Sequence, residues 1–424
     1  DCAAEGLGYA DAEARIAHSG ATVVGITAVT IAIANAAKLA RVLSEAHPEW
    51  RIILGGPHVT AVPEETLRRY PEFDIAVVGE GEVTVRELLD ALKSGAPLDA
   101  VAGLAFRKPD GSVALTPPRP LIEDLDSLPI PAWDLLPPLA TSYETPMFYL
   151  GKTPSSSLVT SRGCCGRCTF CDRSLFGNAC RMHSAQRVLE CMRLLHEQYG
   201  INDVIIHDDA FVINRRRVNE FCAMLRDSGL DMTWGCNARV NLVSPELLRT
   251  MRAAGCWHIA YGLESGSQRV LDTIRKGTTL EQAANAVTWA HEAGLRTRGF
   301  FMIGHPTETV DSIRETIAFA KALPIDDFQI TFFTPFPGSE VYENIREYGS
   351  FNDDWTAMNM WEPLFIAKDL TREQLIYWQR RAFREFYFRP RVVARYLKIV
   401  KNPRHVMKLA RGAFALVEGM VKGG

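Results

Sequence analysis

Residues 162–171 read Arg-Gly-Cys-Cys-Gly-Arg-Cys-Thr-Phe-Cys and place Cys164, Cys168 and Cys171 in a C-x3-C-x2-C spacing on one short segment. Three thiolates this close together can hold three irons of a cubane cluster and leave the fourth iron open to a small molecule. A structural zinc site is the alternative, although zinc takes a fourth ligand and is often held by C-x2-C pairs. Cys165 lies off this spacing, and we expect it to be a bystander.

The chain around this segment alternates between β-branched runs and amphipathic stretches from about residue 156 to residue 338. Six strand candidates are each followed by a helical stretch: 157–161, 203–207, 232–236, 258–262, 296–303 and 328–333. Six βα units in a row predict a parallel barrel or partial barrel, whose chemistry lies at the carboxyl ends of the strands. The cysteine segment directly follows the first of these strands.

The cysteine segment and its position resemble the radical S-adenosylmethionine (radical SAM) superfamily over about residues 156–338. The resemblance implies a [4Fe-4S] cluster on Cys164, Cys168 and Cys171, with S-adenosylmethionine (SAM) chelated at the open iron. One-electron reduction would cleave SAM to a 5′-deoxyadenosyl radical, with the electron supplied by an external reductant of the flavodoxin or ferredoxin type. Residues 151–340 are accordingly expected to form the radical SAM core.

Motifs after the later strands follow in the order found in that superfamily, which implies contacts to SAM. The aromatic residue before the third cysteine would pack near the adenine, paired carboxylates would meet the ammonium, and an arginine would bind the carboxylate. A polar pair after the fourth strand would contact the ribose, and a glycine after the fifth would let the backbone approach the adenine. Each motif alone is weak, because Asp is also a favoured helix cap and an Arg can simply face solvent. The expected SAM-binding residues are Phe170, Asp208, Asp209, Arg239, Glu264, Ser265 and Gly304.

The first hundred residues show a β-α-β-α-β-α rhythm, with strand-like runs at 21–29, 51–54 and 73–78 that predict a parallel sheet covered by helices. Glycine-rich turns follow the second and third runs, where a large ligand can lie against the backbone. This pattern resembles the cobalamin-binding domain of B12-binding radical SAM enzymes, a flavodoxin-like fold whose first strand we expect to precede residue 1. Cobalamin contacts are expected at Thr27, Thr30, Gly55, Gly56, Pro57, Gly79 and Glu80.

One departure from the wider cobalamin pattern limits this expectation. The chain lacks the Asp-x-His-x-x-Gly loop that supplies a histidine to cobalt in some B12 proteins, and His58 is not expected to replace it. Gly-Gly-Pro is also a common tight turn. Cobalamin would therefore be bound without a histidine ligand, or with one from a preceding segment, unless the domain is a vestigial scaffold.

Two further regions complete the chain. A hairpin at 104–115 and seven prolines between residues 117 and 138 predict a linker over 101–150. Residues 341–424 are predicted to be helical and basic, since nine Lys or Arg residues between Arg389 and Lys422 face a single acid, Glu418. Such a helix can lie peripherally on an anionic membrane, or it can be the solvated face of helices packed on the barrel.

Composition narrows the class of protein. Hydrophobic residues at 47% and charged residues at 23% are typical of a globular chain, and a net charge of −3 argues against a protein that coats nucleic acid. The sequence contains no apolar run of about 18 residues and no secretory leader pattern. Four of the ten cysteines fall within eight residues, which indicates metal ligands in a reducing compartment, so we expect a cytoplasmic protein.

Together these features predict a B12-binding radical SAM enzyme, resembling the group of the anaerobic magnesium-protoporphyrin monomethyl ester cyclase and the class B radical SAM methyltransferases. The expected reaction is methylation or oxidative cyclisation of an unactivated carbon in a small, hydrophobic or lipid-like substrate. The alternatives are a cobalamin-independent radical SAM enzyme with a vestigial first domain, and a non-catalytic iron–sulfur or zinc scaffold. No catalytic side chain is assigned.

Overall fold

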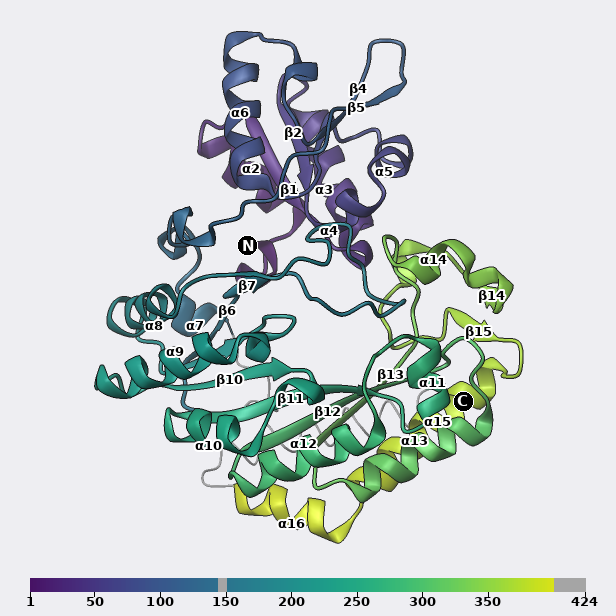
Figure 1. The fold of residues 1–424 in the computed structure, drawn as a ribbon. Helices are drawn as coiled ribbons and strands as arrows, with labels where there is room; N and C mark the ends of the chain where they lie inside the picture. Colours follow the sequence, from purple (N-terminus) through teal and green to yellow (C-terminus); the bar gives the residue numbers. More distant parts are fainter. Residues whose placement is uncertain (144–150, 400–424) are drawn as a thin grey trace.

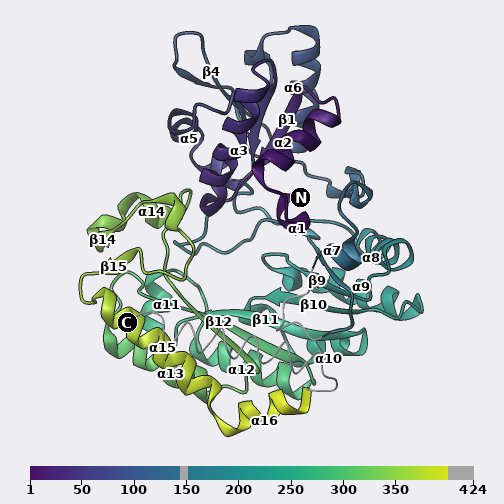
Figure 2. The ribbon, with the colours of Figure 1, turned by 180° about the vertical axis from the view of Figure 1, so that it is seen from behind.

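The computed structural model describes residues 1–143 and 151–399, which form two α/β units (Figure 1). The smaller unit comes first in the chain and stands over the larger one. Seen from behind, the short helix α1 (Cys2–Glu5) and the N-terminus lie between the two units (Figure 2). The functional residues predicted above are divided between these units.

The smaller unit is built on a five-stranded sheet whose strands follow chain order. Strands β1 (Val23–Thr27), β2 (Arg51–Gly55) and β3 (Ile75–Val77) are parallel, as predicted. The hairpin of β4 (Leu104–Arg107) and β5 (Val113–Leu115), expected within the linker, instead extends this sheet because β4 pairs antiparallel with β3. The sheet therefore continues past residue 100.

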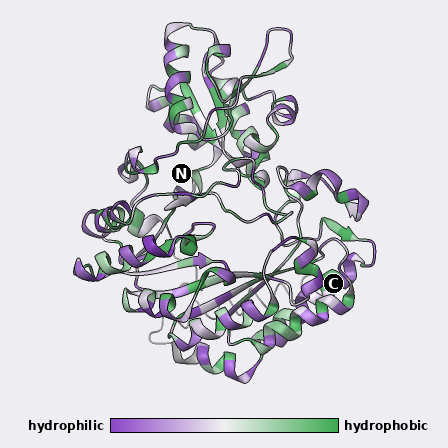
Figure 3. Cartoon of the chain, viewed as in Figure 1, coloured by the Kyte–Doolittle hydropathy of each residue, from purple (hydrophilic) through white to green (hydrophobic). Residues whose placement is uncertain are grey.

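Helices cover this sheet, and Figure 3 shows hydrophobic residues gathered in its strands with hydrophilic ones on the outer helical faces. In α3 the buried residues Ile33, Ala36, Ala37, Ala40 and Leu43 recur every three or four positions, which makes one apolar stripe. The helices of this unit are α2 (Tyr9–His18), α3 (Ile33–Ala46), α4 (Pro57–Ala61), α5 (Pro63–Arg69) and α6 (Gly81–Ser94).

The larger unit contains a six-stranded sheet in which every neighbouring pair is parallel. The strands again follow chain order, and the curled sheet stays open between its first and last strands, which confirms the predicted partial barrel. Its strands are β6 (Ser155–Leu158), β9 (Asp203–Ile206), β10 (Thr233–Ala238), β11 (Cys256–Glu264), β12 (Arg296–Ile303) and β13 (Asp327–Phe332).

The barrel helices begin in a repeated way. A side-chain oxygen of the capping residue accepts a hydrogen bond from the backbone N–H three residues later in five helices, and each such cap stabilises a helix by about 1 kcal/mol. The caps are Ser184, Asn214, Ser244, Thr279 and Thr309. They precede α8 (Ala185–Tyr199), α9 (Arg215–Asp227), α10 (Pro245–Ala253), α12 (Leu280–Glu292) and α13 (Val310–Ala322). A short helix, α11 (Gln268–Thr273), lies before α12.

An aromatic cluster fills the core between β10 and the helices after β9. Phe211, Phe221 and Trp234 are fully buried and meet edge to face, with ring centroids 5.4 to 6.1 Å apart. Burying one such side chain contributes about 1.5–3 kcal/mol, and edge-to-face contact adds to that. This packed aromatic core supports the barrel strands whose ends carry the functional residues.

The region after the barrel was expected to be helical from residue 341, and that expectation is wrong in part. After α14 (Glu340–Asn344) the chain forms an antiparallel ribbon of β14 (Gly349–Phe351) and β15 (Phe365–Ala367), followed by α15 (Arg372–Tyr387) and α16 (Pro390–Ile399). Strands of three residues give too little alternation to be detected in a sequence. The loop of this ribbon carries Trp355 into the core of the smaller unit, against His58.

The predicted basic C-terminal segment lies largely at 400–424, outside the described residues. The arginines within the described part contact the barrel: Arg389 and Arg391 donate to the Lys321 carbonyl, and Arg395 pairs with Asp326 at 2.6 Å. Among residues 1–143 and 151–399, no helix combines the length and the apolar character that crossing a membrane requires.

Candidate functional site

The cysteine loop lies between two short strands, β7 (Ser161–Arg162) and β8 (Arg181–Met182), which pair as an antiparallel ribbon. Cys164, Cys168 and Cys171 all line a cavity of about 470 Å³, whereas Cys165 does not. Gly163 begins the loop with φ +86°, and a Cβ there would lie 2.1 Å from the Ala179 carbonyl oxygen. The ribbon thus closes the loop over the carboxyl ends of the barrel strands.

Neighbouring groups shift the pKa of Cys168 and the pKa of Cys171 in opposite directions. A hydrogen bond from Cys171 is the largest cause that lowers the pKa of Cys168 to about 5; burial opposes it, and Lys276 and Arg239 lower it further. The Arg239 Nη1 lies 3.7 Å from the Cys168 Sγ. In the same pair, the hydrogen bond with Cys168 raises the pKa of Cys171.

These residues fit an iron–sulfur cluster. In the part of the chain that the structure describes, no three His, Cys, Asp or Glu side chains converge as ligands of a single metal ion. A cubane cluster does not need such convergence, because each cysteine binds a different iron. The three thiols open to one cavity, and the neighbouring cations offset the negative charge of such a cluster.

A buried ion pair forms another wall of this cavity. Lys276 Nζ lies 2.6 Å from Glu264 Oε1, and both side chains are less than 10% exposed. Glu264 adopts a left-handed backbone with φ +61°, at an irregularity in the pairing of β11 with β12. Lys276 also lies 6.0 Å from the centre of the Phe170 ring. Sequence reasoning missed Lys276, because it lies in a loop after α11 and not at a strand end.

The two predicted carboxylates after β9 have different surroundings. Asp208 is buried, and its oxygens accept hydrogen bonds from Thr160 N (2.5 Å), Thr160 Oγ1 (2.6 Å) and Ser161 N (3.0 Å). Asp208 thereby fixes the segment that leads into the cysteine loop. Asp209 is exposed to the cavity. Loss of hydration beside the protein is the largest cause that raises its pKa, and the negative charge of Asp208 raises that pKa further. Of the two, Asp209 is the carboxylate open to a ligand.

Only some of the remaining predicted SAM contacts line the cluster cavity. Phe170, Arg239 and Glu264 line the cavity, but Ser265 and Gly304 are not among its lining residues. Ser265 is fully buried and shares a hydrogen bond with Thr316 at 3.0 Å. Gly304 has φ +88°, and its N–H donates to a carboxyl oxygen of Glu308, which also accepts from the His305 N–H. The roles of all these residues toward SAM stay predictions.

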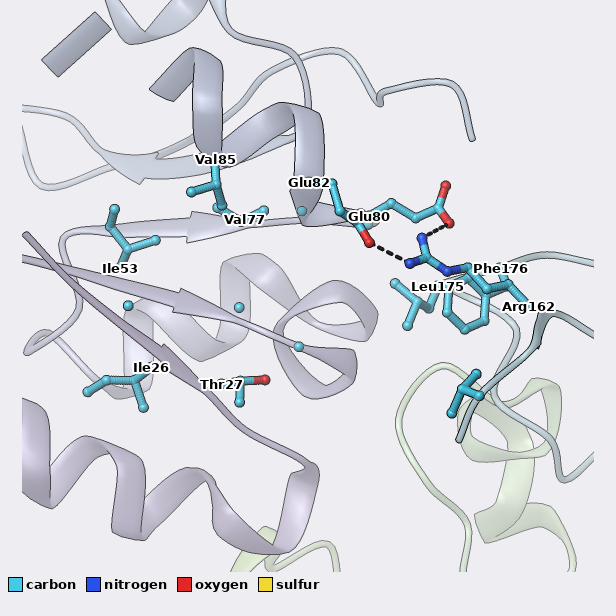
Figure 4. Close-up of a pocket in the computed structure, with 16 residues that line it drawn as sticks. Ile26, Thr27, Ile53, Val77, Glu80, Glu82, Val85, Arg162, Leu175 and Phe176 are labelled. Atoms are coloured by element: carbon cyan, nitrogen blue, oxygen red, sulfur yellow. Dashed lines mark hydrogen bonds and ion pairs between the residues drawn. The ribbon is translucent and has the colours of Figure 1, made fainter. Parts of the chain in front are cut away.

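A second cavity, of about 530 Å³, lies at the carboxyl ends of β1, β2 and β3, and we call it the B12 crevice after the ligand that the sequence predicts for it. Figure 4 shows its lining, in which Ile26, Ile53 and Val77 supply an apolar floor. Five predicted cobalamin contacts line it: Thr27, Gly55, Gly56, Gly79 and Glu80. Arg162, Leu175 and Phe176 close it from the side of the larger unit.

The other two predicted cobalamin contacts lie elsewhere. Pro57 lines the cluster cavity, and Thr30 Oγ1 lies 3.2 Å from His58 Nδ1. His58 Nε2 meets the Thr66 hydroxyl at the same distance, and burial lowers the pKa of His58 to about 4. His58 is therefore neutral, held by two threonines, and does not line the B12 crevice.

The two cavities are neighbours, since Leu175 and Phe176 line both. Because these residues belong to the cysteine loop, the loop forms the partition between the cluster cavity and the B12 crevice. A ligand at the ends of β1–β3 would thus face a ligand bound at the cluster across one layer of side chains.

Comparison with known proteins agrees with this geometry. A model of the radical SAM superfamily matches residues 158–320, and a model of the B12 binding domain matches residues 1–89. An uncharacterized methyltransferase of Pyrococcus horikoshii is 38% identical over 399 residues, which cover 93% of this chain and 84% of the relative. The anaerobic magnesium-protoporphyrin IX monomethyl ester cyclase of Rubrivivax gelatinosus is 30% identical over 370 residues, 86% of this chain and 65% of the cyclase.

Solved structures share the fold. The cobalamin-dependent SAM radical enzyme OxsB, with aqua-cobalamin and SAM bound, is similar with a TM-score of 0.76 at 19% identity, over 97% of this chain and 65% of that one. The chain thus spans just under two thirds of OxsB and of the Rubrivivax cyclase.

The chain therefore belongs to the radical SAM superfamily and carries a B12 binding domain. It is an enzyme of the cobalamin-dependent methyltransferase and cyclase type, whose cofactors are a [4Fe-4S] cluster, SAM and cobalamin. Radical SAM enzymes generally use small-molecule substrates and an external reductant. The predicted family, fold class and cofactors are confirmed, and neither the vestigial domain nor the non-catalytic scaffold finds support.

Proposed function

We propose that the enzyme transfers a methyl group to an unactivated carbon of a small molecule, with cobalamin in the B12 crevice and SAM in the cluster cavity. The observation that carries this proposal is the shared wall of Leu175 and Phe176 between the two cavities. The Pyrococcus relative, which is named a methyltransferase, supports methyl transfer over cyclisation. We assign cobalamin to residues 1–115 and the radical chemistry to residues 155–332.

When bound, the cluster with SAM supplies a 5′-deoxyadenosyl radical, and cobalamin carries the methyl group. The chain's own residues bind and orient these groups. Cys164, Cys168 and Cys171 are the proposed cluster ligands, and the charges of Lys276 and Arg239 help to lower the pKa of Cys168. Asp209, which lines the cluster cavity, is the proposed partner of the SAM ammonium, while Asp208 holds the start of the loop. The cysteine loop separates the two cavities.

The finer predictions on partners and compartment are part of this proposal. All ten cysteines are free, which supports a reducing, cytoplasmic setting. A flavodoxin or ferredoxin is the proposed electron donor. Peripheral membrane contact stays a prediction for residues 400–424, because the described arginines near α16 bind the barrel.

The products of SAM test the proposal. Full-length protein reconstituted without oxygen is incubated with SAM, cobalamin, a one-electron reductant and candidate substrates, and 5′-deoxyadenosine and S-adenosylhomocysteine are quantified. Methyl transfer leaves S-adenosylhomocysteine, so its cobalamin-dependent formation is expected together with 5′-deoxyadenosine. 5′-Deoxyadenosine with a modified substrate but without S-adenosylhomocysteine would indicate cyclisation and refute methyl transfer.

Two cysteine variants provide a matched pair for this assay. Cys168→Ala removes a proposed ligand, and neither product is expected. Cys165→Ala changes a neighbouring, exposed cysteine that does not line the cavity, and both products are expected to persist. SAM cleavage by the Cys168→Ala protein would show that the cluster assignment is wrong.

A further inference from the structure

Glu80 was predicted to contact cobalamin, and in the structure its carboxylate forms ion pairs with two arginines of the larger unit. It follows β3 in the turn before α6, and its side chain is 3% exposed. Glu80 Oε1 lies 2.6 Å from Arg162 Nη1, and the Arg181 Nη1 lies 2.9 and 3.0 Å from the two carboxylate oxygens. The Ile122 N–H, in the linker, donates to Oε2 at 2.7 Å. One carboxylate therefore joins three segments that are far apart in the sequence.

The two arginines are the residues that bracket the cysteine loop. Arg162 and Arg181 are direct partners in the β7–β8 ribbon. Arg162 lies two residues before Cys164, and Arg181 follows Cys180. Glu80 therefore holds both ends of the loop that carries the proposed cluster ligands.

The two arginines also contact Phe176, which lies between the two cavities. Both guanidinium groups lie 5.9 Å from the centre of the Phe176 ring, and Phe176 lines the cluster cavity and the B12 crevice. Glu80 and Arg162 line the B12 crevice themselves, and Figure 4 shows their ion pair at its edge, beside the second pair of Arg162 with Glu82. A ligand in the crevice thus touches the side chains that hold the cluster loop.

The charges of this cluster explain why Arg162 and Arg181 depend on the Glu80 carboxylate. Burial by itself raises the pKa of Glu80, but hydrogen bonds from Arg181 and Arg162 outweigh burial and leave that pKa below its usual value. Among the described residues, Arg181 Nε and Nη2 are buried without a hydrogen-bond partner, so Arg181 depends on its Nη1 contacts with Glu80 and the Ile122 carbonyl. A neutral side chain at position 80 would leave Arg181 without its carboxylate partner and Arg162 with only the more exposed Glu82.

We propose that Glu80 is a positioning residue that couples the B12 crevice to the cluster loop: it fixes both ends of the loop, so that a ligand in the crevice orders the loop, and a cluster on the loop tightens binding in the crevice. This inference rests on the proposed function, because it takes cobalamin as the ligand of the crevice. Coupling between two sites is reciprocal, and typical values change affinity by about 5- to 150-fold.

The test compares Glu80→Gln with the parent in the full-length protein, by two measurements that do not depend on turnover. The first is the affinity for hydroxocobalamin, from its absorbance spectrum, with and without a reconstituted cluster. The second is hydrogen exchange of residues 161–182, by mass spectrometry, with and without hydroxocobalamin. Glu87→Gln is the control, because it breaks another Arg–Glu pair of the same unit, Arg119 with Glu87 on α6, away from the loop.

In the parent and in Glu87→Gln, the cluster is expected to tighten cobalamin binding about 5-fold or more, and cobalamin to slow exchange at 161–182. In Glu80→Gln the affinity ratio is expected to fall to about 1, with no slowing of exchange on cobalamin addition. Coupling that persists in Glu80→Gln would overturn the inference while leaving the proposed function intact. A parent that does not bind hydroxocobalamin would overturn the proposed function itself.

A second variant keeps the test decisive if the Glu80→Gln protein misfolds. Arg162→Lys keeps the positive charge but loses the two-pronged contact with Glu80 and Glu82, and a partial loss of coupling is expected. Full parental coupling in Arg162→Lys, together with misfolding of Glu80→Gln, would assign Glu80 a purely structural role and refute the inference.

Discussion

The buried pair of Lys276 and Glu264 gives a sharp test of how the cluster cavity is built. In the parent, Lys276 Nζ lies 2.6 Å from Glu264 Oε1. Replacing Lys276 with Met removes this ammonium and leaves the Glu264 carboxylate buried and without its partner. Removing one partner of a buried pair costs about 3–5 kcal/mol. Since 1.4 kcal/mol corresponds to a factor of ten, the unfolding equilibrium should shift by at least about 100-fold.

The assay is urea unfolding of the cofactor-free protein, followed by tryptophan fluorescence. The double variant Lys276→Met/Glu264→Gln removes both charges, so it should recover at least half of the stability lost in the single variant. The control Arg249→Met breaks an exposed pair with Glu246 and should leave the midpoint unchanged. A Lys276→Met protein within about 1 kcal/mol of the parent, or a double variant less stable than the single one, would refute this account.

Three further predictions follow from single residues. Gly56→Ala should destabilise the protein by at least about 1–2 kcal/mol, because Gly56 has φ +101° and a Cβ would lie 2.6 Å from Thr27 Oγ1. Gly55→Ala meets nothing within 4 Å and should keep parental stability while weakening hydroxocobalamin binding; equal stability of the two variants would contradict the reasoning. Burial raises the pKa of Glu308 from 4.5 to about 8, so folded protein retains a proton that the unfolded chain releases. The stability from this group is full below about pH 4.5 and is lost as the pH rises toward 8, at up to about 1.4 kcal/mol per unit. Glu308→Gln should flatten that decline in urea unfolding at pH 6, 7 and 8, and an unchanged slope would contradict the assigned pKa. Cys168→Ala should lack the absorbance of a [4Fe-4S] cluster after reconstitution, which Cys165→Ala should retain; absorbance in Cys168→Ala would argue against its role as a ligand.

The strands and the cysteine loop could be predicted from the sequence because their signals are local. A β-branched run of four to eight residues and a C-x3-C-x2-C spacing are visible without knowledge of the partners. The ribbon at 349–367 escaped detection, because its strands of three residues depend on each other for their hydrogen bonds. The hairpin at 104–115 was detected, but a hairpin does not itself indicate which sheet edge it joins.

The candidate site was less predictable, because residue type indicates chemistry but not the partner that engages it. Asp208 and Glu80 were chosen as ligand-binding carboxylates, yet the structure shows both engaged by other parts of the chain. Ser265 was chosen for its hydroxyl, which bonds to Thr316 fifty-one residues later. Lys276 was missed because its position beside the thiols is created by the turn after α11, to which no sequence spacing points.

One chain is expected to hold a cluster and cobalamin in the two adjoining cavities. The most direct measurement is the iron and cobalt content of the full-length protein, reconstituted without oxygen in the presence of cobalamin and reductant. About four irons and about one cobalt per chain are predicted, with the iron lost and the cobalt retained in Cys168→Ala. Four irons without cobalt would contradict cobalamin binding, and iron that persists in Cys168→Ala would contradict the cluster assignment.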